Sequence, residues 1–137
     1  MNPILKNILA VITGWIGGSI INMALVQTGY AIYPLEGVDT NDMDALANAF
    51  SNLDNKHFIF PFLAHALGTL GGALITALIA ASHKIKLALL IGVIFLIGGI
   101  MVSFMIPAPI WFIILDLVVA YIPMAWLGGL LALKFRK

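Results

Sequence analysis

The stretch that decides the fold is FIFPFLAHALGTLGGALITALIAASHK, residues 58–84. Its first 25 residues contain no Lys, Arg, Asp or Glu. A helix of about 20 apolar residues crosses the ~30 Å hydrocarbon core of a bilayer, so this stretch is long enough to span one. Those 25 residues contain one ionisable side chain, His65. An ionisable group inside a span is costly, and it therefore marks a candidate functional site.

The composition of the whole chain indicates a membrane protein. Of its 137 residues, 62% are hydrophobic and 9% are charged, whereas about a quarter of the residues in a soluble domain are charged. The net charge is +1 and no cluster of Lys and Arg alternates with aromatic residues, so we expect no nucleic-acid partner. The chain has no cysteine, which excludes disulfides, thiolate metal ligands and thiol nucleophiles.

Four apolar runs predict an all-α fold, a single domain of four transmembrane helices that covers residues 1–137. Each run has at least 20 residues, and backbone that crosses a bilayer must form its hydrogen bonds within a helix. We expect the spans at residues 4–27, 58–82, 87–106 and 110–133, with a long first loop at residues 28–57. The other two connections are short turns.

The basic residues predict the orientation of the bundle. Lys6, Lys84, Lys86 and the C-terminal KFRK sequence fall on one side of a four-span chain, and Lys56 falls on the other. Because cytoplasmic loops are enriched in Lys and Arg, we expect both termini to face the cytoplasm and the first loop to lie outside. The lipid bilayer is then the main partner of this multi-pass protein.

The outer loop holds five of the six acidic residues of the chain: Glu36, Asp39, Asp42, Asp44 and Asp54. Within it, apolar residues recur at steps of three and four from Met43 to Leu53, which predicts a short amphipathic helix at about residues 41–53. Such a helix lies flat on the outer surface or folds over the bundle as a lid. The spacing of the carboxylates matches no calcium loop, so we interpret them as a solvated polar face.

Small residues that recur along one face of a helix predict close packing between the spans, because small side chains let two helix backbones approach. Three such seams occur, one in each of the first three spans, and their glycines are Gly14, Gly18, Gly68, Gly72, Gly92 and Gly99. Three seams exceed what one compact bundle needs, which favours a homo-oligomer.

The predicted topology brings polar residues from all four spans into the outer half of the membrane. His65 and Asp116 each lie six or seven residues from the outer end of their span, a depth of about 10 Å at 1.5 Å per residue. A carboxylate–imidazole pair would satisfy both groups. Asn22 and Ser103 lie nearer the outer ends of their spans, and Thr69 follows His65 by one helical turn.

Three interpretations of this cluster remain open. In the first, a purely structural network fixes the helix register, as interhelical hydrogen bonds often do, and its members are His65, Asp116, Asn22 and Thr69. In the second, these residues and Ser103 line an outward-open pocket for a small molecule or a lipid head group, with the acidic loop as its cover. In the third interpretation, an intramembrane or metal-dependent enzyme uses His65 and Asp116, with His57 or Glu36 as further ligands.

We favour a non-enzymatic binding or scaffolding protein with a polar pocket. The sequence contains no HExxH motif, no paired catalytic carboxylates and no nucleophile that its context singles out. We therefore assign no catalytic residue, metal ligand or cofactor. An oligomeric small-molecule transporter is a further alternative, but the inner halves of the spans are almost wholly apolar and offer no continuous polar pathway.

Two segments carry a family resemblance: HFIFPFLAHALGTLGGALITALIAASHK, residues 57–84, and DLVVAYIPMAWLGG, residues 116–129. Together they resemble a family of small four-span bacterial membrane proteins that has no assigned activity. The resemblance implies the four-span topology over nearly the whole chain and a location in the bacterial inner membrane. It implies nothing about activity.

Overall fold

The computed structural model describes residues 1–136 and is all-helical, with no strand among those residues. Four helical segments are long and apolar enough to cross a membrane, at Pro3–Ile32, Asn55–Ile79, Lys84–Met105 and Ile110–Phe135. The predicted fold class, a four-helix membrane bundle, is therefore confirmed. The elements in chain order are α1 (Pro3–Ile32), α2 (Met43–Phe50), the 3₁₀ turn η1 (Asn55–Phe58), α3 (Ile59–Ile79), α4 (Lys84–Met105), α5 (Ile110–Val119) and α6 (Ile122–Phe135).

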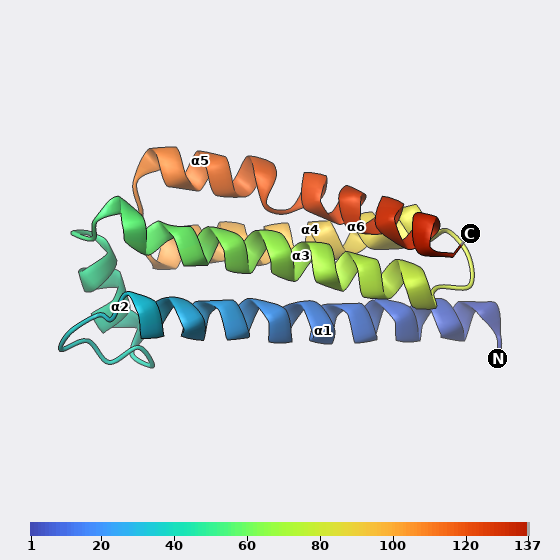
Figure 1. The fold of residues 1–137 in the computed structure, drawn as a ribbon, viewed down its shortest axis with the longest axis horizontal. Helices are drawn as coiled ribbons and strands as arrows, with labels where there is room; N and C mark the ends of the chain where they lie inside the picture. Colours follow the sequence, from blue (N-terminus) through green and yellow to red (C-terminus); the bar gives the residue numbers. More distant parts are fainter. Residues whose placement is uncertain (137) are drawn as a thin grey trace.

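The long helices run side by side along one axis (Figure 1). Both termini and the α3–α4 turn lie at one end of the bundle, and α2 lies at the other. Lys6, Lys84, Lys86 and Lys134 therefore gather at the end opposite to Lys56. Lys137, which also contributed to the predicted orientation, lies outside the described residues. Which of the two ends faces the cytoplasm stays a prediction from the charge pattern, with α2 on the extracytoplasmic side.

Glycines bring α1 and α3 into backbone contact. A Cβ atom added to Gly18 would lie 2.6 Å from the carbonyl oxygen of Gly68, and one added to Gly72 would lie 2.7 Å from the carbonyl oxygen of Gly14. Real Cβ atoms do not approach other atoms so closely, so any larger residue would separate the two helices. Thr76 of α3 adds a hydrogen bond from its hydroxyl to the Ala10 carbonyl of α1, at 3.2 Å.

The third seam, on α4, packs against the fourth span. A Cβ on Gly92 would lie 2.6 Å from the Ala125 Cβ, and one on Gly99 would overlap the hydroxyl of Tyr121. All six predicted packing glycines thus make close contacts inside one chain. The seams therefore provide no surplus surface that would favour a homo-oligomer, and the oligomeric state stays a prediction.

The spans differ from the predicted boundaries at several ends. α1 continues five residues beyond Gln27 because the polar side chains there find partners within the helix: Gln27 donates to the Met23 sulfur, and Thr28 donates to the Ala24 carbonyl. At the other end of the bundle α3 stops at Ile79, three residues early. There the Asn7 side chain of α1 accepts hydrogen bonds from the backbone N–H groups of Ala81 and Ser82, at 2.9 and 3.3 Å.

The fourth span is broken into α5 and α6 at Ala120–Tyr121. The sequence predicts a kink at Pro123, because proline lacks the N–H that would bond to the Val119 carbonyl. The break lies just before that proline, where Tyr121 leaves helical geometry with φ −114° and ψ −79°. Helical hydrogen bonding resumes when the Ala125 N–H donates to the Tyr121 carbonyl, at 2.8 Å.

The outer loop contains the predicted amphipathic helix in shorter form, α2. Asp42 is its N-cap, and the carboxylate accepts from the backbone N–H groups of Asp44 and Ala45 at 2.9 and 3.2 Å. The apolar face is directed at the bundle, where Leu46 is buried and Phe50 packs edge-on against Phe58. Of the two predicted placements, the structure therefore has the lid over the bundle.

Candidate functional site

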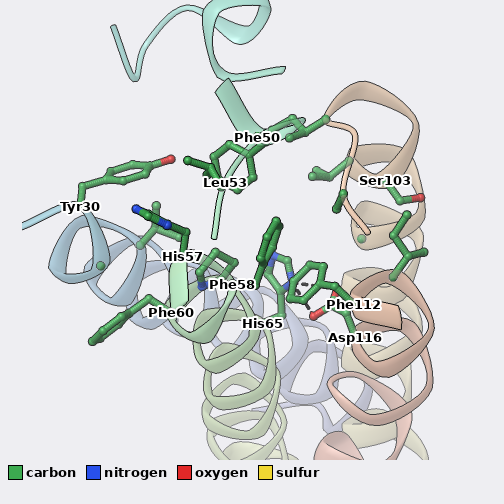
Figure 2. Close-up of a pocket in the computed structure, with 18 of the residues that line it drawn as sticks. Tyr30, Phe50, Leu53, His57, Phe58, Phe60, His65, Ser103, Phe112 and Asp116 are labelled. Atoms are coloured by element: carbon green, nitrogen blue, oxygen red, sulfur yellow. Dashed lines mark hydrogen bonds and ion pairs between the residues drawn. The ribbon is translucent and has the colours of Figure 1, made fainter. Parts of the chain in front are cut away.

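A cavity of about 350 Å³ lies at the outer end of the bundle, beneath α2 (Figure 2). Residues of α1, α3, α4 and α5 form its walls, and Met43, Phe50 and Leu53 reach it from α2 and the segment after it. The lining is mostly apolar, and its polar groups include the side chains of His65 and Asp116. A mostly apolar cavity with a few polar groups is the usual form of a ligand site.

His65 of α3 and Asp116 of α5 form an ion pair that also lines this cavity. The imidazole Nδ1 lies 2.8 and 2.9 Å from the two carboxylate oxygens of Asp116, so it donates its hydrogen to the carboxylate. The exposed fractions are 19% for the His65 side chain and 6% for that of Asp116. Figure 2 shows the pair between the two helices, below the aromatic side chains. The predicted pairing is therefore present in the structure.

Tyr121 is a third member of the site that the sequence analysis missed. Its hydroxyl donates to Asp116 Oδ2 at 3.0 Å, and its ring stacks on the His65 ring with centroids 5.7 Å apart. In a regular helix, residues five apart point about 140° away from each other, so the spacing of Asp116 and Tyr121 does not suggest a contact. The break between α5 and α6 makes the contact possible, and Pro123 is the sequence signal for that break.

This arrangement fixes the role of each nitrogen of His65. Since Nδ1 donates to Asp116, the remaining nitrogen, Nε2, is the one left for the cavity, and it has no hydrogen bond to any residue from 1 to 136. A carboxylate behind one imidazole nitrogen holds the ring in one orientation and one tautomer. The site therefore presents one oriented nitrogen, which accepts a hydrogen bond when His65 is neutral and donates one when it is protonated.

The other three predicted site residues are less well placed to contact a ligand in the cavity. Ser103 lines the cavity, but its hydroxyl donates to the Ile100 carbonyl of its own helix, at 2.7 Å. Asn22 lies on α1 against Gly68, outside the cavity lining. Thr69 is fully buried, also outside the lining, and its hydroxyl has no hydrogen-bond partner among the described residues. Three of the five predicted residues, His65, Asp116 and Ser103, therefore line the cavity, and two of them, His65 and Asp116, form a hydrogen-bonded cluster with Tyr121.

Aromatic side chains make up much of the wall and were not predicted as part of the site. Figure 2 shows Tyr30, Phe58, Phe60 and Phe112 around the cavity. Phe58 is buried and packs against Phe112, with ring centroids 4.9 Å apart. The sequence signal is the density of aromatic residues on both sides of the first loop, which also fits the aromatic belt of a membrane interface.

The described part of the chain contains no group of three or more His, Cys, Asp or Glu side chains that could hold a metal ion. His57 and Glu36, the further ligands considered in the enzyme interpretation, thus do not join His65 and Asp116 in such a group. His57 lines the outer part of the cavity and packs against the Tyr33 ring at 5.9 Å.

Comparison with known proteins adds no family to this description: no family model, curated protein or solved structure matches the chain. The resemblance to small four-span bacterial proteins therefore stays an expectation, and the geometry of the cavity is the evidence that bears on function.

Proposed function

We propose that this multi-pass membrane protein binds a small amphipathic molecule in the cavity under α2, and that His65 Nε2 makes the polar contact. The observation that carries the proposal is the oriented imidazole. Asp116, itself bonded to Tyr121, holds the His65 ring through Nδ1, whereas Nε2 has no hydrogen bond to any described residue, and His65 lines a mostly apolar cavity with aromatic walls. A small molecule or a lipid head group with one polar group and an apolar body fits this distribution.

The purely structural interpretation explains less of the site. A polar pair that only fixes helix register needs no cavity beside it, and its polar atoms are normally all satisfied by neighbouring helices. Here one nitrogen of the pair has no partner, and a separate helix, α2, covers the space next to it. These features support binding over a role confined to stability.

Binding is also favoured over catalysis. Ser103 is the one serine or threonine in the cavity lining, so its hydroxyl is the candidate nucleophile. That hydroxyl donates its hydrogen bond to the Ile100 carbonyl within α4. An enzyme that combines a His–Asp pair with a side-chain nucleophile needs the nucleophile within hydrogen-bond reach of the base. A location in the inner membrane of a bacterium, with α2 on the outer side, is part of this proposal and is based on the charge distribution and the family resemblance.

Native mass spectrometry of the protein released from mild detergent tests this proposal. The wild type is compared with His65→Ala and with a control, His83→Asn, which removes an exposed histidine at the opposite end of the bundle. Asparagine is chosen because His83 has a positive φ of 52°, a left-handed backbone conformation that asparagine tolerates.

We expect a discrete bound mass on the wild type and on His83→Asn that His65→Ala loses. A wild-type protein that carries no bound mass, or a mass equally present on His65→Ala, would contradict the proposal. The same spectra report the oligomeric state.

A further inference from the structure

The charge of the site points to the class of ligand. Asp116 is the one acidic residue within the four apolar spans of the sequence, and its carboxylate lies in a mostly buried position. Tyr121, at the start of α6, contacts the pair, and the other titratable residues of the cavity lining are Tyr30 of α1, Tyr33 after it and His57 of η1; α4 contributes none to the lining among the described residues. With a neutral His65, the site therefore carries one uncompensated negative charge.

One positive charge makes the site neutral, and an apolar environment strongly favours that state over a net charge. A second proton on His65 can supply this charge. A cationic ligand at Nε2 can supply it as well, because the free nitrogen of a neutral imidazole accepts a hydrogen bond from an ammonium group. The two cannot occupy Nε2 at the same time, so they compete.

The cavity wall suits an organic cation. Tyr33 and Phe60 belong to the lining, as do the aromatic residues deeper in the cavity, and the faces of aromatic rings attract cations. One of these rings already contacts a cation of the protein: Lys56 Nζ lies 5.7 Å from the centroid of the Tyr33 ring.

The loop around the cavity mouth has the matching charge. Its five acidic residues are all exposed: Glu36, Asp39, Asp42, Asp44 and Asp54. Lys56 is the one basic residue of the same loop. Such a surface raises the local concentration of cations and repels anions. An anionic lipid or fatty acid is therefore disfavoured both at the mouth and at the Asp116 end.

We infer that the ligand is a lipophilic ammonium compound, and that it binds by replacing the second proton of His65. In the bound state an N–H of the ammonium donates to Nε2, Asp116 supplies the counter-charge through Nδ1–H, and the apolar body lies among the aromatic rings. The proton that leaves Nε2 passes to solvent, so each ligand that binds to doubly protonated His65 releases one proton, and a ligand that binds to neutral His65 releases none. This inference rests on the proposed binding function and adds to it the charge of the ligand and its link to pH.

Isothermal titration of the purified full-length protein tests the inference with three probes that share one apolar part: phenylbutylamine, phenylbutanol and phenylbutyrate. The amine stays protonated from pH 5.5 to 8.5, since alkylammonium groups titrate near pH ~10.4 as lysine does. Titrations in buffers of different ionisation enthalpy count the protons released. The variants are Asp116→Asn, which removes the charge, and Tyr121→Phe, which keeps the His65–Asp116 pair.

We expect the amine to bind at least about tenfold more tightly than the alcohol, and the carboxylate to bind most weakly. The affinity for the amine rises about tenfold per pH unit while His65 holds its second proton and is constant at higher pH, because one proton competes with one ligand. Proton release approaches one per amine in the acidic range. Tyr121→Phe keeps this behaviour, whereas Asp116→Asn loses the preference for the amine.

Three results would overturn the inference: affinity for the amine that does not change with pH, tighter binding of the carboxylate, or no binding of any probe. The proton count uses the wild type alone and does not depend on the folding of a variant. A bound mass that His65→Ala loses in native mass spectra would leave the proposed function standing in each of these cases, so the two claims fail separately.

Discussion

Replacing His65 with alanine should destabilise the protein more than replacing its partner Asp116 with asparagine. His65→Ala removes two of the three side-chain contacts of the Asp116 carboxylate, at 2.8 and 2.9 Å, and leaves the 3.0 Å bond from Tyr121. Breaking a buried ion pair from one side costs about 3–5 kcal/mol because a charge is left unpaired. We expect about 3 kcal/mol, at the low end, because Tyr121 still donates to the carboxylate.

The double variant gives the sharper test. Asp116→Asn leaves an amide oxygen that can still accept one hydrogen bond, so it should cost about 1–2 kcal/mol. Adding Asp116→Asn to His65→Ala removes the unpaired charge, and the double variant should therefore be more stable than His65→Ala alone by about 1 kcal/mol. Two destabilising substitutions would then partly cancel, which is expected only for residues in direct contact.

Equilibrium unfolding in mixed micelles measures these differences, with the fluorescence of the three tryptophans as the signal. Tyr121→Phe is the matched control, because it removes one hydrogen bond to Asp116 and leaves the pair intact. If His65→Ala costs less than about 1 kcal/mol, or if Asp116→Asn destabilises it further, then His65 does not hold a buried carboxylate and the proposed geometry is wrong.

Three further predictions concern the fold and the lid. Gly18→Leu should prevent stable folding, because even a Cβ there would lie 2.6 Å from a backbone oxygen of α3. Gly98→Leu should be tolerated, because a Cβ there would meet nothing within 4 Å beyond the adjoining backbone of its own helix. Thermal melts in detergent compare the two variants, and equal melting temperatures would contradict the prediction. In this cysteine-free chain, Asn48→Cys should react with an impermeant thiol reagent only from outside the cell, and Lys86→Cys only from the cytoplasm; the reverse labelling would overturn the orientation. Phe50→Ala shortens the lid side chain over the cavity, so bound ligand should dissociate several-fold faster in stopped-flow measurements, and an unchanged rate would exclude α2 as a lid.

The lengths of the hydrophobic runs predicted the fold because a bilayer permits few backbone conformations. Backbone inside it must be helical, so four apolar runs gave four helical spans, and the charge pattern ordered their ends. Boundaries were less predictable. Gln27 and Thr28 suggest that α1 ends there, but both side chains bond within the helix, and the helix continues to Ile32.

The site could be predicted only in part. The depth of His65 and Asp116 follows from counting residues, and the cost of a lone charge in a membrane makes their pairing the expected outcome. Tyr121 could not be predicted as their partner, because its contact depends on the local geometry of the break before Pro123. Asn22 and Thr69 have suitable depth and chemistry, but the rotation of each helix, set by the glycine contacts, turns them away from the cavity.

Nitrogen-15 NMR of the imidazole of His65 tests the central claim most directly. The chain has three histidines, so selective ¹⁵N-histidine labelling gives a simple spectrum, and His65→Gln assigns the signals of interest. On titration with the molecule found by native mass spectrometry, or with phenylbutylamine, we predict that the Nε2 signal of His65 shifts in proportion to occupancy. The signals of His83, at the other end of the bundle, should stay constant. Saturable binding that leaves the Nε2 signal of His65 unchanged would contradict the account, because the ligand would then lie away from the one nitrogen on which the proposed site is built.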